Sequence, residues 1–264
     1  ANIQGEKSLA EKGFQFLKMQ LNGENWYMIF NTGISMKDEW VELAAPAKSY
    51  IFFNPMNSEV SVAESDKNRI HLQLEPEQCL FVKCAENETG APAFTYEDTA
   101  EKPVKIGALW RISFMNGGPA YPGNVQTDEL FSWTKMGDIE TRRFAGTVRY
   151  QTEFDREGDA KTAILNLGVV KDCARVKLNG KEIGTILGPS FKIKVDNLVP
   201  GKNILQVDVT NVAANRIRDL DINKVEWRRF NDINFVNIDY EPFDASGWEI
   251  RDAGLLGPVT VKGF

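Results

Sequence analysis

Short runs of alternating apolar and polar residues, separated by residues that favour turns, recur along most of this chain. Residues 14–21 alternate in this way before Asn22-Gly23, and the apolar run of residues 26–30 follows that pair. An Asn-Gly pair between two such runs is typical of a two-residue β-hairpin. The same arrangement returns at Asn179-Gly180, between two further alternating runs. The pattern predicts an all-β chain of antiparallel sheets.

The remaining strand candidates are equally short and evenly spaced. They are expected over residues 40–44, 50–53, 59–63, 69–74, 79–84, 105–115, 148–154, 163–167, 191–195, 204–209 and 259–261. A polar stretch with Pro and Gly separates two groups of them and predicts a linker over residues 89–102. Residues 1–88 and 103–264 are therefore expected to form two antiparallel β-sandwich domains. We expect one short helical turn near residues 138–143 and a functional or interaction loop over residues 211–257.

Charge and hydropathy exclude several classes of function. The net charge is −6 and the pI is about 5.1, so a non-specific electrostatic grip on nucleic acid or on an anionic membrane is not expected. No apolar run approaches the roughly 18 residues that a membrane span needs. The chain has a single histidine, His71, which excludes His-rich zinc sites. Because His71 alternates with apolar neighbours, we expect it to be solvated on the polar face of a strand.

The three cysteines do not predict a disulfide. Cys79 and Cys84 lie five residues apart in one apolar run, which puts them on opposite faces of a strand, roughly 16 Å apart. That separation is too long for a disulfide between them. Together with Cys173, they are expected to be unpaired thiols that pack as small hydrophobic side chains.

Turn and core positions of the predicted second domain follow one another in a recognisable order. They are Phe144-Ala145-Gly146-Thr147, Leu165-Asn166-Leu167-Gly168, Val176-Lys177-Leu178-Asn179-Gly180-Lys181, Gly184, Pro189, Phe191, Asp196, Leu198, Pro200-Gly201-Lys202-Asn203, Leu205, Val207, Val209 and Asn211. With these positions the second domain resembles the galactose-binding-like jelly roll, which is the sugar-binding domain of glycoside hydrolase family 2 and its relatives. The resemblance implies a jelly-roll fold for residues 103–264.

Further segments resemble the C-terminal end of large bacterial glycosidases, and they are most similar to glycoside hydrolase family 106, the α-L-rhamnosidase family. In the second domain they are Asn211, Asn215-Arg216 and residues 254–259, and in the first domain they are residues 26–31, 54–57 and 74–82. In that family the catalytic acids belong to a barrel domain, and no βα repeat of a barrel occurs in this chain. The resemblance therefore implies a non-catalytic accessory or structural region of a bacterial glycoside hydrolase, whose partner is the catalytic domain of the parent enzyme.

The long stretch after residue 211 supplies the candidate ligand-binding residues, which are Asn211, Asn215, Arg216, Trp227, Arg228 and Trp248. An arginine flanked by aromatic rings suits sugar stacking and hydroxyl hydrogen bonds, and it suits a contact between domains equally well. The sequence departs from the family at Leu187-Gly188, where relatives often carry an aromatic residue, and at Ala213-Ala214, where they often carry Trp-Pro. These departures weigh against direct glycan binding.

Two alternatives to the accessory role stay open. An autonomous carbohydrate-binding module for oligo- or polysaccharide needs exposed rings, for which Trp110, Trp133, Tyr121 and Trp248 are available. A complete small glycosidase needs a pair of carboxylates about 5 to 10 Å apart in a cleft.

No catalytic residue and no cofactor is predicted, although a jelly roll can hold a structural calcium ion through loop carbonyls. The alternating oxygens of residues 219–223 resemble the start of an EF-hand loop, but Lys224 stands where that loop needs glycine, so a solvated turn is expected. The chain opens at Ala1 without an initiator Met, which favours a processed chain or part of a longer one. The family resemblance implies a periplasmic or extracellular location.

Overall fold

The computed structural model divides into two compact units. It describes residues 5–98, 100–156, 162–188, 190–228 and 240–263. The first unit comprises Ala1–Ala100 with Gly188–Ser190, and the second comprises Glu101–Leu187 with Phe191–Phe264. Among the described residues, no helix has the length and apolar character that crossing a membrane requires.

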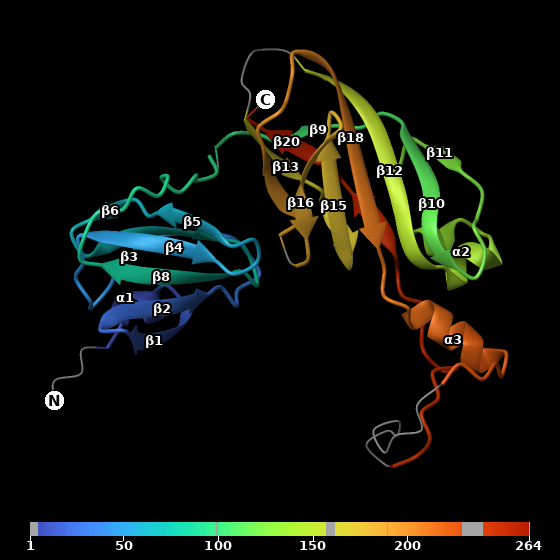
Figure 1. Cartoon of the computed structure of the whole chain (residues 1–264), viewed down its shortest axis with the longest axis horizontal. Coiled ribbons are helices and arrows are strands. Elements are labelled where there is room, and N and C mark those ends of the chain that lie inside the picture. The colour runs from blue at the N-terminus through green and yellow to red at the C-terminus, as the bar shows by residue number, and fades with distance from the viewer. Residues whose placement is uncertain (1–4, 99, 157–161, 189, 229–239, 264) are drawn as a thin grey trace. The chain divides into compact units, whose positions relative to one another are not determined.

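The first unit is built from two antiparallel sheets and one short helix in its described part (Figure 1). The five-stranded sheet has the order β1 (Gln15–Leu21), β2 (Glu24–Phe30), β8 (Cys79–Ala85), β4 (Ser49–Asn54) and β5 (Glu59–Val62). The three-stranded sheet has the order β3 (Lys37–Glu42), β7 (Arg69–Leu74) and β6 (Ser65–Asp66). Helix α1 (Lys7–Glu11) precedes the first strand and buries Leu9.

The predicted hairpin at Asn22-Gly23 is confirmed. Asn22 and Gly23 have φ angles of 54° and 85°, the left-handed conformation that a two-residue turn of this type requires. They align Leu21 with Glu24 and bring Gln15 opposite Phe30. This register directs Tyr27 and Ile29 into the core, where both are fully buried.

The segment predicted as a linker differs from the expectation, because much of it packs on the first unit. Ala93 forms a parallel bridge with Val62, and the amide of Phe94 donates to the Val62 carbonyl over 2.8 Å. The ring of Phe94 meets that of Phe52 edge-on at 5.2 Å. Two aromatic residues in this otherwise polar stretch, Phe94 and Tyr96, pack on strands that are distant in the sequence.

The second unit is a larger pair of facing sheets (Figure 1). In the described residues, the first sheet has six strands, in the order β11 (Val125–Thr127), β10 (Trp110–Gly118), β12 (Ala145–Arg156), β18 (Gly201–Thr210), β15 (Cys173–Leu178) and β16 (Lys181–Ile186). The second has four, in the order β17 (Lys192–Val195), β13 (Ala163–Asn166), β20 (Thr260–Lys262) and β9 (Val104–Lys105). Strands β14 (Val169–Lys171) and β19 (Gly254–Gly257) pair separately.

The core of the second unit contains large aromatic side chains. Trp110, Trp133, Phe144 and Tyr150 are almost completely buried between the sheets. The short 3-10 helix η1 (Trp133–Lys135) and helix α2 (Ile139–Arg143) close one end, and the position of α2 confirms the predicted helical turn. Both units together confirm the predicted all-β class, with antiparallel β-sandwiches.

The long stretch after residue 211 contains more regular structure than the sequence predicts. Helix α3 (Ala214–Ile222) follows β18, and β19 precedes the last strand. Strand β10 also continues to Gly118, three residues beyond the end of the strand predicted over residues 105–115. Pro189, one of the residues that carry the family resemblance, lies outside the described residues.

All three cysteines lie in the described part of the chain and are free thiols, as predicted. Cys84 is buried in the core of the first unit, where burial raises the pKa of its thiol to about 12. Cys84 therefore packs as an apolar side chain.

Candidate functional site

Asn211 fixes the point at which the chain leaves strand β18 and enters α3. Its side-chain oxygen accepts a hydrogen bond from the Gly146 amide at 2.9 Å, and its side-chain amide donates to the Phe144 carbonyl at 3.0 Å. Both partners lie on β12 or at its start, so Asn211 holds the last residues of β18 beside that strand. Its amide is used for backbone hydrogen bonds, which makes it a positioning residue.

Asn215 and Arg216 hold α3 to its surroundings. Asn215 is 5% exposed and exchanges two hydrogen bonds with the backbone of Arg251, at 2.8 Å and 2.9 Å. Arg216 donates to Asp219 one turn along the same helix, at 2.5 Å. The guanidinium of Arg143 on α2 lies 3.6 Å from the other oxygen of Asp219, which links the two helices. These predicted site residues support the helix.

Trp227, Arg228, Phe243 and Trp248 lie together beyond the end of α3, and we call them the aromatic cluster. The ring of Phe243 meets Trp227 edge-on at 6.1 Å and Trp248 edge-on at 5.6 Å. The guanidinium of Arg228 lies 5.7 Å from the Trp227 ring and 5.8 Å from the Phe243 ring. The structure thus brings together three of the six predicted ligand-binding residues and adds Phe243, which is distant in the sequence.

The carboxylate of Asp221 organises this cluster from the end of α3. It accepts hydrogen bonds from the indole N–H of Trp227 at 2.6 Å and from the Ala245 amide at 2.8 Å, and it lies 3.7 Å from Arg228. Its side chain is 5% exposed. Asp221 therefore ties the helix end, Trp227 and the segment around Ala245 into one arrangement.

An open hollow of about 420 Å³ lies beside the cluster. Its lining carries both signs of charge and consists of Asp221, Lys224, Val225, Glu226, Arg228 and Asp244. Hydrogen bonds from the amide and hydroxyl of Ser246, together with the nearby Arg228 charge, hold the pKa of Asp244 below its usual range. The hollow therefore presents acidic and basic side chains next to one another, a lining that suits a polar, uncharged ligand.

The residues that resemble the start of an EF-hand lie in α3 and at its end rather than in a solvated turn. Asp219 accepts hydrogen bonds from Arg216 and Asn223, and Asp221 accepts those of Trp227 and Ala245. Their oxygens thus face N–H donors, as in ordinary helix-end contacts. Across the described ranges, no three His, Cys, Asp or Glu side chains gather in a group that could hold a metal ion.

Two of the four rings considered for glycan stacking are unsuited to it. Trp110 and Trp133 are at most 1% exposed and form part of the core, so the prediction that they are available rings is wrong. Trp133 packs edge-on against Phe114 and Phe144, a contact that residue type alone does not predict. Tyr121 and Trp248 are exposed, at 58% and 41%.

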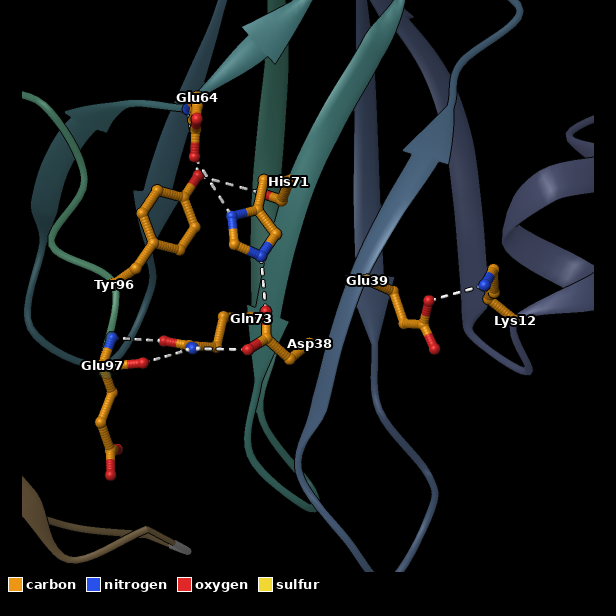
Figure 2. Close-up of polar contacts among 8 residues, drawn as sticks. All are labelled: Lys12, Asp38, Glu39, Glu64, His71, Gln73, Tyr96 and Glu97. Carbon is orange, nitrogen blue, oxygen red and sulfur yellow. Dashed lines mark hydrogen bonds and ion pairs between the residues drawn. The ribbon is translucent and has the colours of Figure 1, made fainter. Parts of the chain in front are cut away.

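The first unit contains a polar cluster that the sequence does not predict (Figure 2). His71 lies between the carboxylates of Asp38 and Glu64, and Tyr96 covers its ring. The expectation that His71 is solvated is wrong, because its side chain is only 18% exposed. Asp38, Glu64 and Tyr96 come from three separate segments, so no local motif identifies the group.

Comparison with known proteins relates this chain to parts of larger proteins. No family model matches it. Over 198 residues it is 31% identical to a protein of Formosa agariphila named "Putative beta-glucuronidase", and the match covers 67% of this chain and 17% of that protein. The fold is similar to part of a rhamnosidase from Novosphingobium sp. PP1Y, with a TM-score of 0.72 and 19% identity over 94% of this chain and 23% of the rhamnosidase.

A β-glucuronidase from Bifidobacterium dentium is 20% identical, and the match covers 44% of this chain and 21% of the glucuronidase. Its TM-score of 0.36 is too low for a comparison of folds. The chain spans less than a quarter of each of these proteins. Membership of glycoside hydrolase family 106 remains a prediction. The sequence similarity and the shared fold identify this chain as a domain region related to glycoside hydrolases.

Proposed function

We propose that this chain is a non-catalytic accessory region of a larger glycoside hydrolase. The observation that carries the proposal is the 31% identity to a segment that makes up 17% of a protein named for a glycosidase activity. A segment of this size leaves ample length for a catalytic domain, which needs roughly 250 residues as a barrel. The parent enzyme would act on a glycoside such as a rhamnoside or a glucuronide, in the periplasm or outside the cell.

The aromatic cluster is the proposed contact surface for the catalytic domain. Aromatic and arginine side chains dominate the energetics of protein interfaces, and Trp227, Arg228 and Trp248 provide both kinds. Asn211, Asn215 and Arg216 act behind this surface by fixing α3. In this proposal the six residues divide into contacting and positioning groups.

The test measures association and activity separately. The chain and the remaining part of the parent enzyme are produced as two proteins, and their affinity is measured by calorimetry. We expect the chain alone to hydrolyse no aryl rhamnoside or glucuronide, and we expect it to bind the remaining part. Trp227→Ala with Trp248→Ala weakens that binding, whereas Tyr121→Ala, which removes an exposed ring elsewhere, leaves it unchanged. Hydrolysis by the chain alone refutes a non-catalytic role.

A second candidate function is glycan binding by the chain itself. The exposed Trp248 and the hollow beside Arg228 favour it, since sugar sites combine a ring surface with convergent polar groups. Affinity electrophoresis through gels that contain plant or host polysaccharides, run with calcium and then with EDTA, tests this function. Glycan binding is supported if one polysaccharide slows the chain and Trp248→Ala abolishes that retardation. Equal mobility in every gel rejects glycan binding.

A further inference from the structure

Residues 92–98 lie as a strap along the first unit, and the last of them stands shortly before the second unit begins at Glu101. At the start of the strap, the Val62 amide donates to the Pro92 carbonyl and the Phe94 amide donates to the Val62 carbonyl, both over 2.8 Å. The Phe94 ring packs on Phe52. The early part of the strap is therefore held by backbone pairing and by the partly buried ring of Phe94.

The later part of the strap is held by polar contacts to strand β7 (Figure 2). Gln73 accepts a hydrogen bond from the Glu97 amide at 2.6 Å and donates to the Glu97 carbonyl at 2.9 Å. The hydroxyl of Tyr96 donates to the His71 carbonyl and accepts from the Glu64 amide, each over 3.0 Å. His71 and Gln73 lie on the face of β7 opposite to the buried Ile70 and Leu72, so the strap covers the outer face of this strand.

His71 is the centre of these contacts. Its ring is stacked between Trp40, at 5.3 Å and 9°, and Tyr96, at 4.3 Å and 12°. Its Nε2 lies 2.5 Å from Asp38, and its Nδ1 lies 3.3 Å from Glu64. A neutral imidazole has one N–H donor, whereas the imidazolium has two. Only the imidazolium donates to both carboxylates at once.

Two aromatic faces and two carboxylates surround the imidazole. Two π-faces enclose it, and a positive charge over an aromatic face is stabilised electrostatically. The charged and titratable groups that face it are Asp38 from β3, Glu64 from the turn before β6, and Tyr96 from the strap, whose phenol stays neutral because burial raises its pKa to about 12. The guanidinium of Arg69 lies 5.5 Å from the centre of the Trp40 ring, on the outer side of this stack of rings.

We propose that His71 is a proton-controlled latch that fastens the strap to the first unit. When His71 carries two protons, Asp38 and Glu64 are both bound, and the Tyr96 ring rests on a cation. When His71 loses one proton, one carboxylate faces a nitrogen lone pair, and the stack loses its charge. The strap then detaches from the first unit more often. While it is detached, residues 92–98 lengthen the connecting segment that leads to the second unit.

Amide hydrogen exchange measures the latch directly. The Phe94 and Glu97 amides are bonded only while the strap is docked, so their protection factors, corrected for intrinsic exchange, report its opening. Because the hydrogen bond that is lost goes to a charged group, we expect protection to fall by about tenfold or more between pH 5.5 and pH 8.5. His71→Gln lowers protection at pH 5.5 and removes its pH dependence.

Strand β3 offers a matched control. Glu39 neighbours Asp38 and forms an exposed ion pair with Lys12 at 2.6 Å, away from the strap (Figure 2). Asp38→Asn should reduce the pH dependence, whereas Glu39→Gln should retain it in full. Equal protection of the wild-type amides at both pH values, or an unchanged pH dependence in His71→Gln, overturns the proposal.

A second measurement needs no variant. Since the chain has one histidine, its imidazole ¹⁵N signals belong to His71 without further assignment. Two protonated nitrogens at the pH of strong protection, and one at the pH of weak protection, support the latch. A single protonated nitrogen at pH 5.5 refutes it.

Discussion

Asp221→Asn tests whether one buried carboxylate holds the aromatic cluster together. In the wild type the two oxygens of Asp221 accept separate hydrogen bonds, one from the Trp227 indole and one from the Ala245 amide. Asparagine replaces one of these acceptors with an NH₂ donor, so one of the two bonds must break. A hydrogen bond to a charged group contributes about 1.5–3 kcal/mol. We expect the free energy of opening at this site to fall by about 2 kcal/mol, equivalent to roughly a 30-fold loss of protection.

Proton NMR gives the readout, because the Trp227 indole N–H and the Ala245 amide can each be followed through hydrogen exchange. Glu226→Gln is the matched control, since Glu226 is an exposed carboxylate that lines the same hollow. It should change protection by less than twofold, in keeping with the small contributions of exposed charges. The reasoning fails if Asp221→Asn leaves both protons protected as in the wild type, or if the control loses as much protection.

Three further predictions concern the stability of the two units. Glu6→Gln should lower the unfolding free energy of the first unit by about 2–3 kcal/mol in urea titrations, because the buried carboxylate accepts three hydrogen bonds. The control variant Glu11→Gln, which removes an exposed ion pair, should lower that free energy by less than about 0.5 kcal/mol. Burial raises the pKa of the Cys84 thiol from 9.0 to about 12, so the fold keeps this thiol protonated. The resulting contribution to the unfolding free energy is complete below pH 9 and declines between pH 9 and pH 12. The urea midpoint should therefore fall over this range, and less steeply in Cys84→Ala. Gly254→Ala should lower the melting temperature of the second unit, because Gly254 has a φ of 109° and an added Cβ would lie 2.3 Å from the Tyr150 hydroxyl; an unchanged melting temperature contradicts this.

Local sequence signals predict the elements that depend on local geometry. Asn179 and Gly180 have φ angles of 51° and 80°, as the predicted hairpin requires, and the β15–β16 register follows from them. The N-cap of α2 is Asp138, whose side chain accepts a hydrogen bond from the Glu140 amide, so the predicted helical turn is stabilised by a contact within its own segment.

Helix α3 escapes prediction because it lacks the usual marks of a helix. Its N-cap, Ala213, makes no side-chain hydrogen bond, and Asn215 is its only buried residue. A sequence pattern normally predicts a helix from a stripe of apolar residues on one face, whereas the buried side chain of α3 is the amide of Asn215. The backbone of Arg251, thirty-six residues further on, supplies the partner that makes this burial favourable.

The candidate site is only partly predictable for the same reason. Trp227, Arg228 and Trp248 are identified by residue type, since aromatic rings around an arginine suggest a contact surface. Residue type cannot distinguish an asparagine that meets a ligand from one that meets the backbone. Asn211 bonds to Gly146, sixty-five residues away, and this pairing appears only once strands β12 and β18 lie side by side.

The docked strap determines where the protein can be divided for separate production of its parts. A first half that ends at residue 88 lacks Phe94 and Tyr96, so it leaves Phe52 and the imidazole of His71 without the rings that cover them. Such a fragment presents newly exposed apolar surface and a tendency to aggregate. A first half that ends at Ala100 retains those rings and begins the other half at Glu101. The boundary between the two units thus lies fifteen residues beyond Ala85, where strand β8 of the first unit ends.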